Sequence, residues 1–173
     1  LWQLGMTGGL AWQQHWWWTV LTATFLHGGL IHILFNMFAV QRYLPMVAEL
    51  FGTARAFVLY MVAGAAGFLL SNLVAGSSTI GASCAIFGLL GALIVYGRRT
   101  GQMAVTAQLG QLALVMFLFG FFMPNVNNWG HAGGFVGGYV TAELMMSSVH
   151  KREGPGDVVL AGALALATVA GLA

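Results

Sequence analysis

Charged residues are scarce in this chain. Only 6% of its 173 residues are Asp, Glu, Lys or Arg, whereas 59% are hydrophobic. A soluble domain carries about 25% charged residues, because polar groups must cover much of its surface. The scarcity of charge therefore excludes an ordinary soluble domain. The six scattered Lys and Arg residues also make no electrostatic footprint for nucleic acid, so no nucleic-acid partner is expected.

Cysteine is almost absent as well. The single cysteine, Cys84, excludes an internal disulfide framework and a cysteine-based zinc site. The first residues lack the basic stretch with which a cleaved signal peptide begins. What the chain does contain is long apolar runs and 25 glycines, which suit close helix packing in lipid. These features predict an all-α protein, a polytopic transmembrane helical bundle whose immediate partner is the lipid bilayer.

Apolar runs of about 17–25 residues, the length that a bilayer requires, divide the chain. Residues 1–25 contain no such run, and we expect an aromatic-rich loop or short helices at the membrane interface; a soluble N-terminal arm is the alternative. Residues 26–149 are the expected transmembrane core, and residues 150–173 a cytoplasmic linker with an additional, partial C-terminal span. The expected spans are Leu26–Pro45, Ala56–Ala75, Ile80–Gly97, Val105–Met123, Gly130–Val149 and Val158–Ala173.

The basic residues predict the orientation of these spans. They lie around the connections after the first, third and fifth spans: Arg42, Arg55, Arg98, Arg99, Lys151 and Arg152. By the positive-inside rule these connections face the cytoplasm. All tryptophans then fall on the outer side, where Trp favours the headgroup zone: Trp2, Trp12, Trp16, Trp17, Trp18 and Trp129.

Four polar residues inside the expected spans are costly to place in a bilayer: His32, Asn36, Ser83 and His131. Each lies near the start of a span that enters from the outer side. Since a helix rises about 1.5 Å per residue, all four share the outer part of the membrane. This common depth predicts one polar site.

The residue types at this depth suit nucleophilic catalysis. A serine needs a base within hydrogen-bond reach, and His131 is the candidate base for Ser83. Negative charge on a tetrahedral oxygen needs donors, which His32, Asn36 and the Ser83 backbone N–H can supply. A Ser–His dyad is expected instead of a triad, because all acidic residues lie toward the cytoplasmic side: Glu49, Glu143, Glu153 and Asp157.

Several neighbours are candidate supporting residues. Gly134 and Gly138 follow His131 on one helix face, and small residues at this spacing let helices approach closely. Phe87 lies one turn after Ser83, where its ring can pack on the imidazole of His131. Taken singly, each of these residues is also typical of ordinary packing or capping.

His27 lies at the mouth of the expected site. Together with His32 and His131 it offers an alternative interpretation, a metal site. The five-residue spacing to His32 is poor for a shared face, and no carboxylate is near. We therefore expect no metal and no cofactor.

Three segments resemble those of the rhomboid family of intramembrane serine proteases. The run His27-Gly-Gly-Leu-Ile-His32-Ile-Leu-Phe-Asn36 is similar to the family pattern H-x4-H-x3-N. The segments Gly81–Gly91 and Asn128–Gly134 resemble those around the family's serine and histidine. The order of the segments also matches, over about 120 residues.

The resemblance implies a rhomboid-like fold and a serine endopeptidase that cleaves other proteins in or near their transmembrane segments. It implies Ser83 as nucleophile, His131 as base, and His32, Asn36 and the Ser83 amide as the oxyanion hole. It further implies a multi-pass protein of a bacterial plasma (inner) membrane, with its active site toward the outer side. Transmembrane protein substrates are the expected partners.

Some positions depart from the family pattern. Cys84 stands where the family usually has Gly, Phe87 where it often has Tyr, and Trp18-Thr19 lacks the Arg of its Trp-Arg pair. A side chain at position 84 would crowd the oxyanion hole or the facing helix, and Cys84→Gly is then expected to raise turnover. From the resemblance we expect this chain to start after the first of the family's six spans, and residues 158–173 would then correspond to the extra span of six-plus-one rhomboids.

Two other functions remain open at this point. A catalytically silent rhomboid-like protein would bind transmembrane helices without cleaving them, which the presence of both Ser83 and His131 disfavours and Cys84 weakly favours. A small channel or transporter would need polar residues deep toward the cytoplasmic half, where the spans have few. The substrate, its cleavage site and the oligomeric state are left open.

Overall fold

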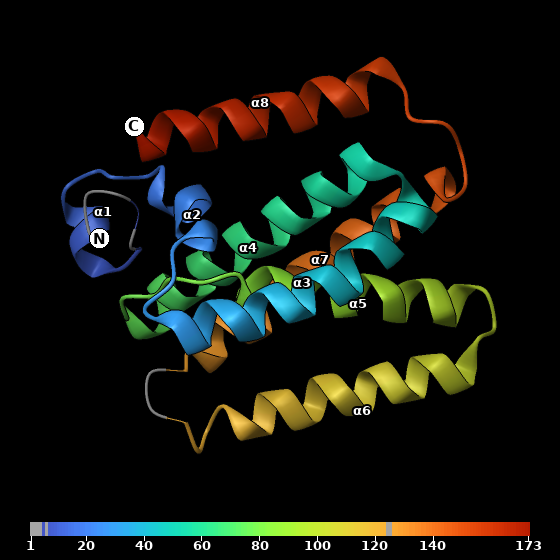
Figure 1. Ribbon diagram of the computed structural model, residues 1–173, viewed down its shortest axis with the longest axis horizontal. Helices are drawn as coiled ribbons and strands as arrows, with labels where there is room; N and C mark the ends of the chain where they lie inside the picture. The colour runs from blue at the N-terminus through green and yellow to red at the C-terminus, as the bar shows by residue number, and fades with distance from the viewer. Residues whose placement is uncertain (1–4, 6, 124–125) are drawn as a thin grey trace.

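A computed structural model describes residue 5, residues 7–123 and residues 126–173 (Figure 1). Trp2, which the charge pattern assigns to the outer side, lies outside these residues. The described residues form helices and no strand; Thr7 and Thr79 make an isolated antiparallel bridge. The all-α prediction is therefore confirmed. The helices are α1 (Gly9–Gln13), α2 (Thr19–Thr22), η1 (Ala23–Phe25), α3 (Leu30–Phe51), α4 (Thr53–Ala75), α5 (Ser83–Arg99), α6 (Met103–Phe119), α7 (Asn128–Met145), η2 (Met146–Ser148) and α8 (Pro155–Leu172).

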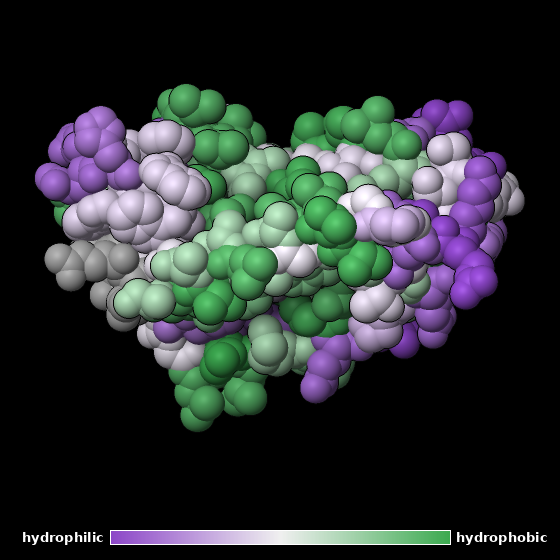
Figure 2. All heavy atoms as spheres, turned by 90° about the horizontal axis from the view of Figure 1, so that it is seen from above, coloured by the Kyte–Doolittle hydropathy of each residue, from purple (hydrophilic) through white to green (hydrophobic). Residues whose placement is uncertain are grey.

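The long helices run back and forth between two ends of a bundle. The α3–α4, α5–α6 and α7–α8 connections lie together at one end, at the right of Figure 1. The α4–α5 and α6–α7 connections and the N-terminal short helices lie at the other end. Figure 2 shows hydrophobic residues over the middle of the molecule and hydrophilic residues gathered at its ends, most densely at the right. This distribution is that of a bundle embedded in a bilayer.

Hydropathy separates the helices into two groups. The helices α3, α4 and α8 are long and apolar enough to cross a membrane, and α6, with 17 residues, is a shorter apolar helix. The other two, α5 and α7, are rich in glycine. Helix α5 lies inside the bundle, whereas α7 buries one face and exposes apolar side chains such as Val136, Val140 and Leu144 on the other. The apolar helices and the bundle architecture together define an integral membrane protein.

The first long helix differs from the span expected from hydropathy. Leu26 is extended, and α3 begins only at Leu30 and continues through Pro45 to Phe51. A proline inside a helix removes one backbone donor and strains the preceding turn, but here the helix does not end there. Arg42 consequently lies within α3 and not in a connection; its long side chain can extend toward the headgroups.

The central helix is α5. Every residue from Cys84 to Val95 is buried. Its contact with α7 is a contact of backbones: a Cβ at Gly138 would overlap the backbone of Gly88, and a Cβ at Gly134 would overlap the carbonyl of Cys84. The close approach that the glycine spacing predicts is thus present in the structure.

Arg55 organises the end that carries the charged connections. It is only 6% exposed, and its guanidinium donates to backbone carbonyls of α3 and of the α7–α8 connection: Phe51, Ser148, Lys151 and Arg152. It also pairs with Asp157 at the start of α8, at 2.7 Å. Nearby, Arg99 pairs with Glu143 on the surface. The Arg55 bonds join α3, α4 and α8, and the Arg99 pair joins α5 to α7, all at one end of the bundle.

Candidate active site

Ser83 is the first residue of α5, at the end opposite to Arg55. The turn before it depends on Gly81, whose φ of +118° is a conformation that L side chains rarely adopt. A Cβ there would also lie 2.6 Å from Nε2 of His32. The Gly81 N–H donates to the carbonyl of Ala23 at 2.8 Å, so this turn is tied to η1. The sharp turn leaves the Ser83 side chain half-buried at the edge of a cavity.

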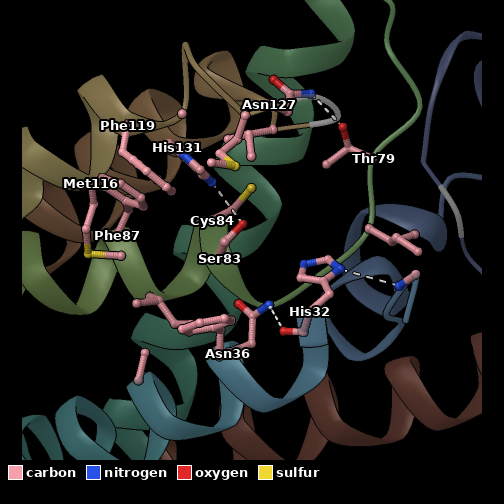
Figure 3. A pocket seen from close by; sticks show the side chains of 18 of the residues that line it. His32, Asn36, Thr79, Ser83, Cys84, Phe87, Met116, Phe119, Asn127 and His131 are labelled. Atoms are coloured by element: carbon pink, nitrogen blue, oxygen red, sulfur yellow. Dashed lines mark hydrogen bonds between the residues drawn. The ribbon is translucent and has the colours of Figure 1, made fainter. Parts of the chain in front are cut away.

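His131 lies opposite Ser83, in the first turn of α7. Its Nε2 is 3.0 Å from the Ser83 hydroxyl oxygen, a hydrogen-bond distance, although 48 residues separate the two in the chain (Figure 3). The glycines at positions 134 and 138 permit this approach, because they let the backbones of α5 and α7 touch one and two turns further along.

The imidazole plane is set by an aromatic stack. Phe87 lies parallel to His131, with ring centroids 4.4 Å apart and an interplanar angle of 17°. Within the described chain, Nδ1 of His131 is buried without a hydrogen-bond partner. The orientation of the ring therefore comes from stacking and from the bond to Ser83, with no carboxylate behind it. Phe87 occupies the position expected for it, on the face of the imidazole.

His32 and Asn36 lie on the other side of Ser83 and line the same cavity (Figure 3). The Asn36 amide donates to the carbonyl of His32 at 2.8 Å, which uses one of its two N–H groups and leaves the second. The Gly28 N–H donates to Nδ1 of His32 at 3.4 Å. In the neutral imidazole the proton then sits on Nε2, the nitrogen that faces Gly81. Both side chains thus present an N–H donor toward the Ser83 side of the cavity.

His27 precedes α3 and stacks edge-on against His32, with ring centroids 5.0 Å apart. Burial lowers the pKa of His27, and the neighbouring His32 lowers it further, which favours the neutral imidazole. The described residues contain no group of three metal-ligating side chains. The contact of His27 with His32 places it at the border of the site.

Cys84 lines the cavity beside Ser83, and its side chain packs against α4 and α7. The position of a Cβ at Gly67 on α4 lies 2.7 Å from Cβ of Cys84, and that of a Cβ at Gly130 on α7 lies 2.9 Å from its Sγ. The thiol, which is 1% exposed, thus fills a notch between two glycines. Of the two kinds of crowding expected from the sequence, the structure shows contact with the facing helices.

The cavity beside Ser83 has a volume of about 660 Å³. Its aromatic and aliphatic walls come mainly from α3, α5 and α6, and residues of the α4–α5 connection and of the start of α7 complete the lining. Phe35 and Phe38 line it and are each 74% exposed; Phe119 also lines it and is 57% exposed. Because the same side chains form the cavity wall and the outer surface, the cavity reaches the lipid-facing side of the bundle.

Two residues that the sequence reasoning missed also lie here. Asn127 caps the start of α7, its side chain accepting from the Gly130 N–H at 3.0 Å, and its amide donates to the Thr79 hydroxyl at 2.5 Å. An Asn before an expected helix is an N-cap signal, so the cap at Asn127 could have been found from the sequence. Its bond to Thr79, in another connection, could not.

The fold and this site define a class of protein: an all-helical integral membrane protein in which a serine hydroxyl, an imidazole and two further N–H donors meet at the edge of a lipid-accessible cavity. The model of the Rhomboid domain family matches residues 14–148. The chain belongs to this family.

Curated relatives agree with this membership. The chain is 31% identical to the "Rhomboid protease GluP" of Bacillus subtilis over 158 residues, 90% of this chain and 31% of that protein. It is 31% identical to RHOMBOID-like protein 4 of Arabidopsis thaliana, over 80% of this chain and 38% of that protein. It is also 29% identical to the protein named "Inactive RHOMBOID-like protein 8" of the same plant, over 86% and 45%. The chain spans less than half the length of each of these relatives.

Proposed function

We propose that this chain is an intramembrane serine endopeptidase that cleaves transmembrane segments of other proteins through Ser83 and His131. The observation that carries the proposal is the 3.0 Å distance between the Ser83 hydroxyl and Nε2 of His131. A serine hydroxyl is a weak nucleophile unless a base accepts its proton, and this contact supplies a base.

The residues around the pair fit the steps of peptide hydrolysis. Ser83 Oγ attacks the peptide carbonyl carbon while its proton moves to Nε2 of His131. The carbonyl oxygen becomes negative in the tetrahedral intermediate, where His32, Asn36 and the Ser83 backbone N–H donate to it. His131 then gives the proton to the departing amine, which leaves an ester on Ser83. Water, with its proton taken by His131, hydrolyses this ester and restores the hydroxyl.

The cavity supports a transmembrane substrate. Its apolar lining and its exposure on the lipid side suit a hydrophobic segment that arrives within the bilayer. A helical segment must unwind before attack, because helical hydrogen bonds occupy its backbone. Small or polar residues near the outer end of the substrate helix would favour that unwinding.

The proposed location is a plasma membrane, with the Ser83 end on the outer side. Five of the six basic residues lie at the opposite end, near the start of α4, at the end of α5 and in the α7–α8 connection, and the positive-inside rule assigns this end to the cytoplasm. A cysteine introduced at exposed Ser147 should react with a membrane-impermeant thiol reagent only after the cells are opened, because buried Cys84 gives no background. Reaction in intact cells would reverse the orientation.

A fluorophosphonate probe for activated serines tests the proposal in detergent. The starting chain should be labelled and should cleave a model transmembrane substrate, whereas Ser83→Ala should do neither. Ser147→Ala, an exposed serine at the other end, is the matched control and should behave like the starting chain. Labelling that persists in Ser83→Ala would place the nucleophile elsewhere. A starting chain that retains a transmembrane peptide but neither labels nor cleaves would favour the silent, helix-binding alternative, for which a relative named inactive is a precedent.

A further inference from the structure

Asn127 makes polar contacts that neither the sequence pattern nor the proposed reaction assigns. Its amide nitrogen lies within hydrogen-bond reach of three hydroxyl oxygens, on Ser71 of α4 and on Ser77 and Thr79 of the α4–α5 connection. Ser71 is fully buried, and its hydroxyl is 3.3 Å from that of Ser77. Two amide N–H groups and three hydroxyls therefore form one cluster, of which Asn127 and Thr79 line the cavity (Figure 3).

The position of this cluster along the chain relates it to the reacting pair. Asn127 precedes His131 by four residues, and Thr79 precedes Ser83 by four. The bond from Asn127 to Thr79, at 2.5 Å, is thus a second link between the same two segments, beside the Ser83–His131 contact. Among the described residues, the side-chain hydrogen bonds between the start of α7 and the α4–α5 connection are those of Asn127 and that of the reacting pair.

Asn127 also holds His131 through the backbone. The His131 N–H donates to the Asn127 carbonyl at 3.1 Å, and the side-chain oxygen of Asn127 caps the Gly130 N–H at 3.0 Å. On the other side, the α5 N-cap residue, Ala82, has no capping side chain. The start of α5 therefore depends on bonds made by its preceding connection.

From this geometry we infer that Asn127 is a positioning residue for the proposed reaction: its amide clamps the connection before Ser83 to the helix start that carries His131. The inference rests on the proposed function for its kinetic consequence, but the clamp itself is a property of the fold. A displacement of about 1 Å between reacting groups can lower a rate about 100-fold, so loss of the clamp should act on turnover and leave substrate binding unchanged.

The test uses Asn127→Ser in the whole chain. Serine is an equally good N-cap, so the start of α7 keeps its cap, but the shorter side chain cannot reach Thr79. The matched control is Asn72→Ser. Asn72 lies at the same end and donates from the same kind of amide to the Thr7 hydroxyl at 2.7 Å. Thr7 pairs with Thr79 through backbone hydrogen bonds, which the substitution at position 72 leaves in place.

In Asn127→Ser we expect the turnover of a transmembrane model substrate to fall about 10- to 100-fold per folded molecule. The rate of fluorophosphonate labelling should fall by a similar factor, and KM should stay within about twofold of that of the starting chain. Asn72→Ser should change neither. Thr79→Val, which removes the accepting hydroxyl from the other side, should reproduce the loss, and the double variant should be no slower than either single one. Unchanged turnover with a lower unfolding temperature would reduce Asn127 to a structural residue, and a rise in KM alone would make it a substrate contact; either result overturns the inference.

Hydrogen–deuterium exchange separates this inference from the proposed function. Peptides covering residues 79–84 and 128–132 should exchange faster in Asn127→Ser than in the starting chain and in Asn72→Ser, whether or not the protein is an active protease. If exchange at both segments is unchanged, the clamp does not exist. If exchange rises but Ser83→Ala retains full labelling, the clamp stands and the proposed nucleophile is wrong.

Discussion

At one end of the bundle Arg55 is buried among backbone carbonyls and paired with Asp157; at the other, Ser83 and His131 meet among neutral donors and a phenyl ring. Both ends bury polar groups, but the first does so with opposite charges and the second with none. A buried cation needs several acceptors to offset its desolvation, and the four carbonyls bound to Arg55 serve that purpose. A neutral imidazole has no such need and can accept a proton.

This contrast suggests that the two ends serve different properties of the protein. The charged end joins α3, α4 and α8 through Arg55 and α5 to α7 through Arg99, and it should govern stability, whereas the neutral end should govern chemistry. Variants that remove single groups at each end test whether the two properties are separate.

The largest effect on stability is expected for Arg55→Met. The change keeps the apolar stem but removes the donors of four carbonyls and the partner of Asp157. We expect the free energy of unfolding to fall by about 3–5 kcal/mol, since breaking a buried charged network strands its remaining polar groups. Denaturant unfolding in detergent measures this. Turnover per folded molecule should stay within about twofold; a large loss of turnover would mean that the two ends are coupled.

Asn36→Ala tests the neutral end, where we expect turnover to fall while stability changes little. Loss of one oxyanion donor typically lowers turnover about 10²–10³-fold, and we expect a change of that size with little change in unfolding temperature. Steady-state cleavage of a model substrate, with Ser147→Ala as a control, provides the measurement. Normal turnover in Asn36→Ala would remove this amide from the mechanism.

Cys84→Gly is expected to have a smaller effect. Because the thiol fills the notch between Gly67 and Gly130, its removal leaves a void and should lower stability by about 1–2 kcal/mol. This packing gives no support to the increase in turnover that the family pattern suggests. A double-mutant cycle measures the contact directly: Gly130→Ala should be destabilising in the starting chain, where Sγ of Cys84 would lie 2.9 Å from the new Cβ, and much less so when combined with Cys84→Gly. A marked gain of turnover in Cys84→Gly would restore the crowding interpretation.

The smallest effect is expected for Arg99→Gln. Its pair with Glu143 lies at the charged end, but the Arg99 side chain is 61% exposed. Exposed pairs are screened by water and salt and contribute little to stability. The thermal midpoint should therefore not change measurably at physiological salt, in contrast to Arg55→Met. An equally large loss of stability in Arg99→Gln and Arg55→Met would show that burial is not what distinguishes the two ion pairs.

Much of the fold and of the candidate site could be predicted from the sequence. The scarcity of charge and the apolar runs predict a helical membrane protein, because a bilayer penalises both polar side chains and unpaired backbone. The depth of Ser83, His131, His32 and Asn36 follows from counting residues into each span. The glycines at 134 and 138 indicate close helix contact by their spacing alone.

Helix boundaries were harder to predict. Hydropathy averages over many residues, so it ends the first span at Pro45, whereas α3 continues to Phe51. The same averaging begins the third span at Ile80, although the left-handed Gly81 delays the start of α5 until Ser83.

Composition and local spacing were enough to establish the medium in which the chain folds, its helical class and the residue types available for chemistry. Which groups touch was settled only by the packed bundle: Nε2 of His131 with Ser83, the Asn127 amide with Thr79, and the Cys84 thiol with Gly130. Each of these contacts joins residues about 46–48 positions apart. Such pairs form when several helices pack at once, and no local pattern encodes the rotation and depth that bring them within hydrogen-bond distance.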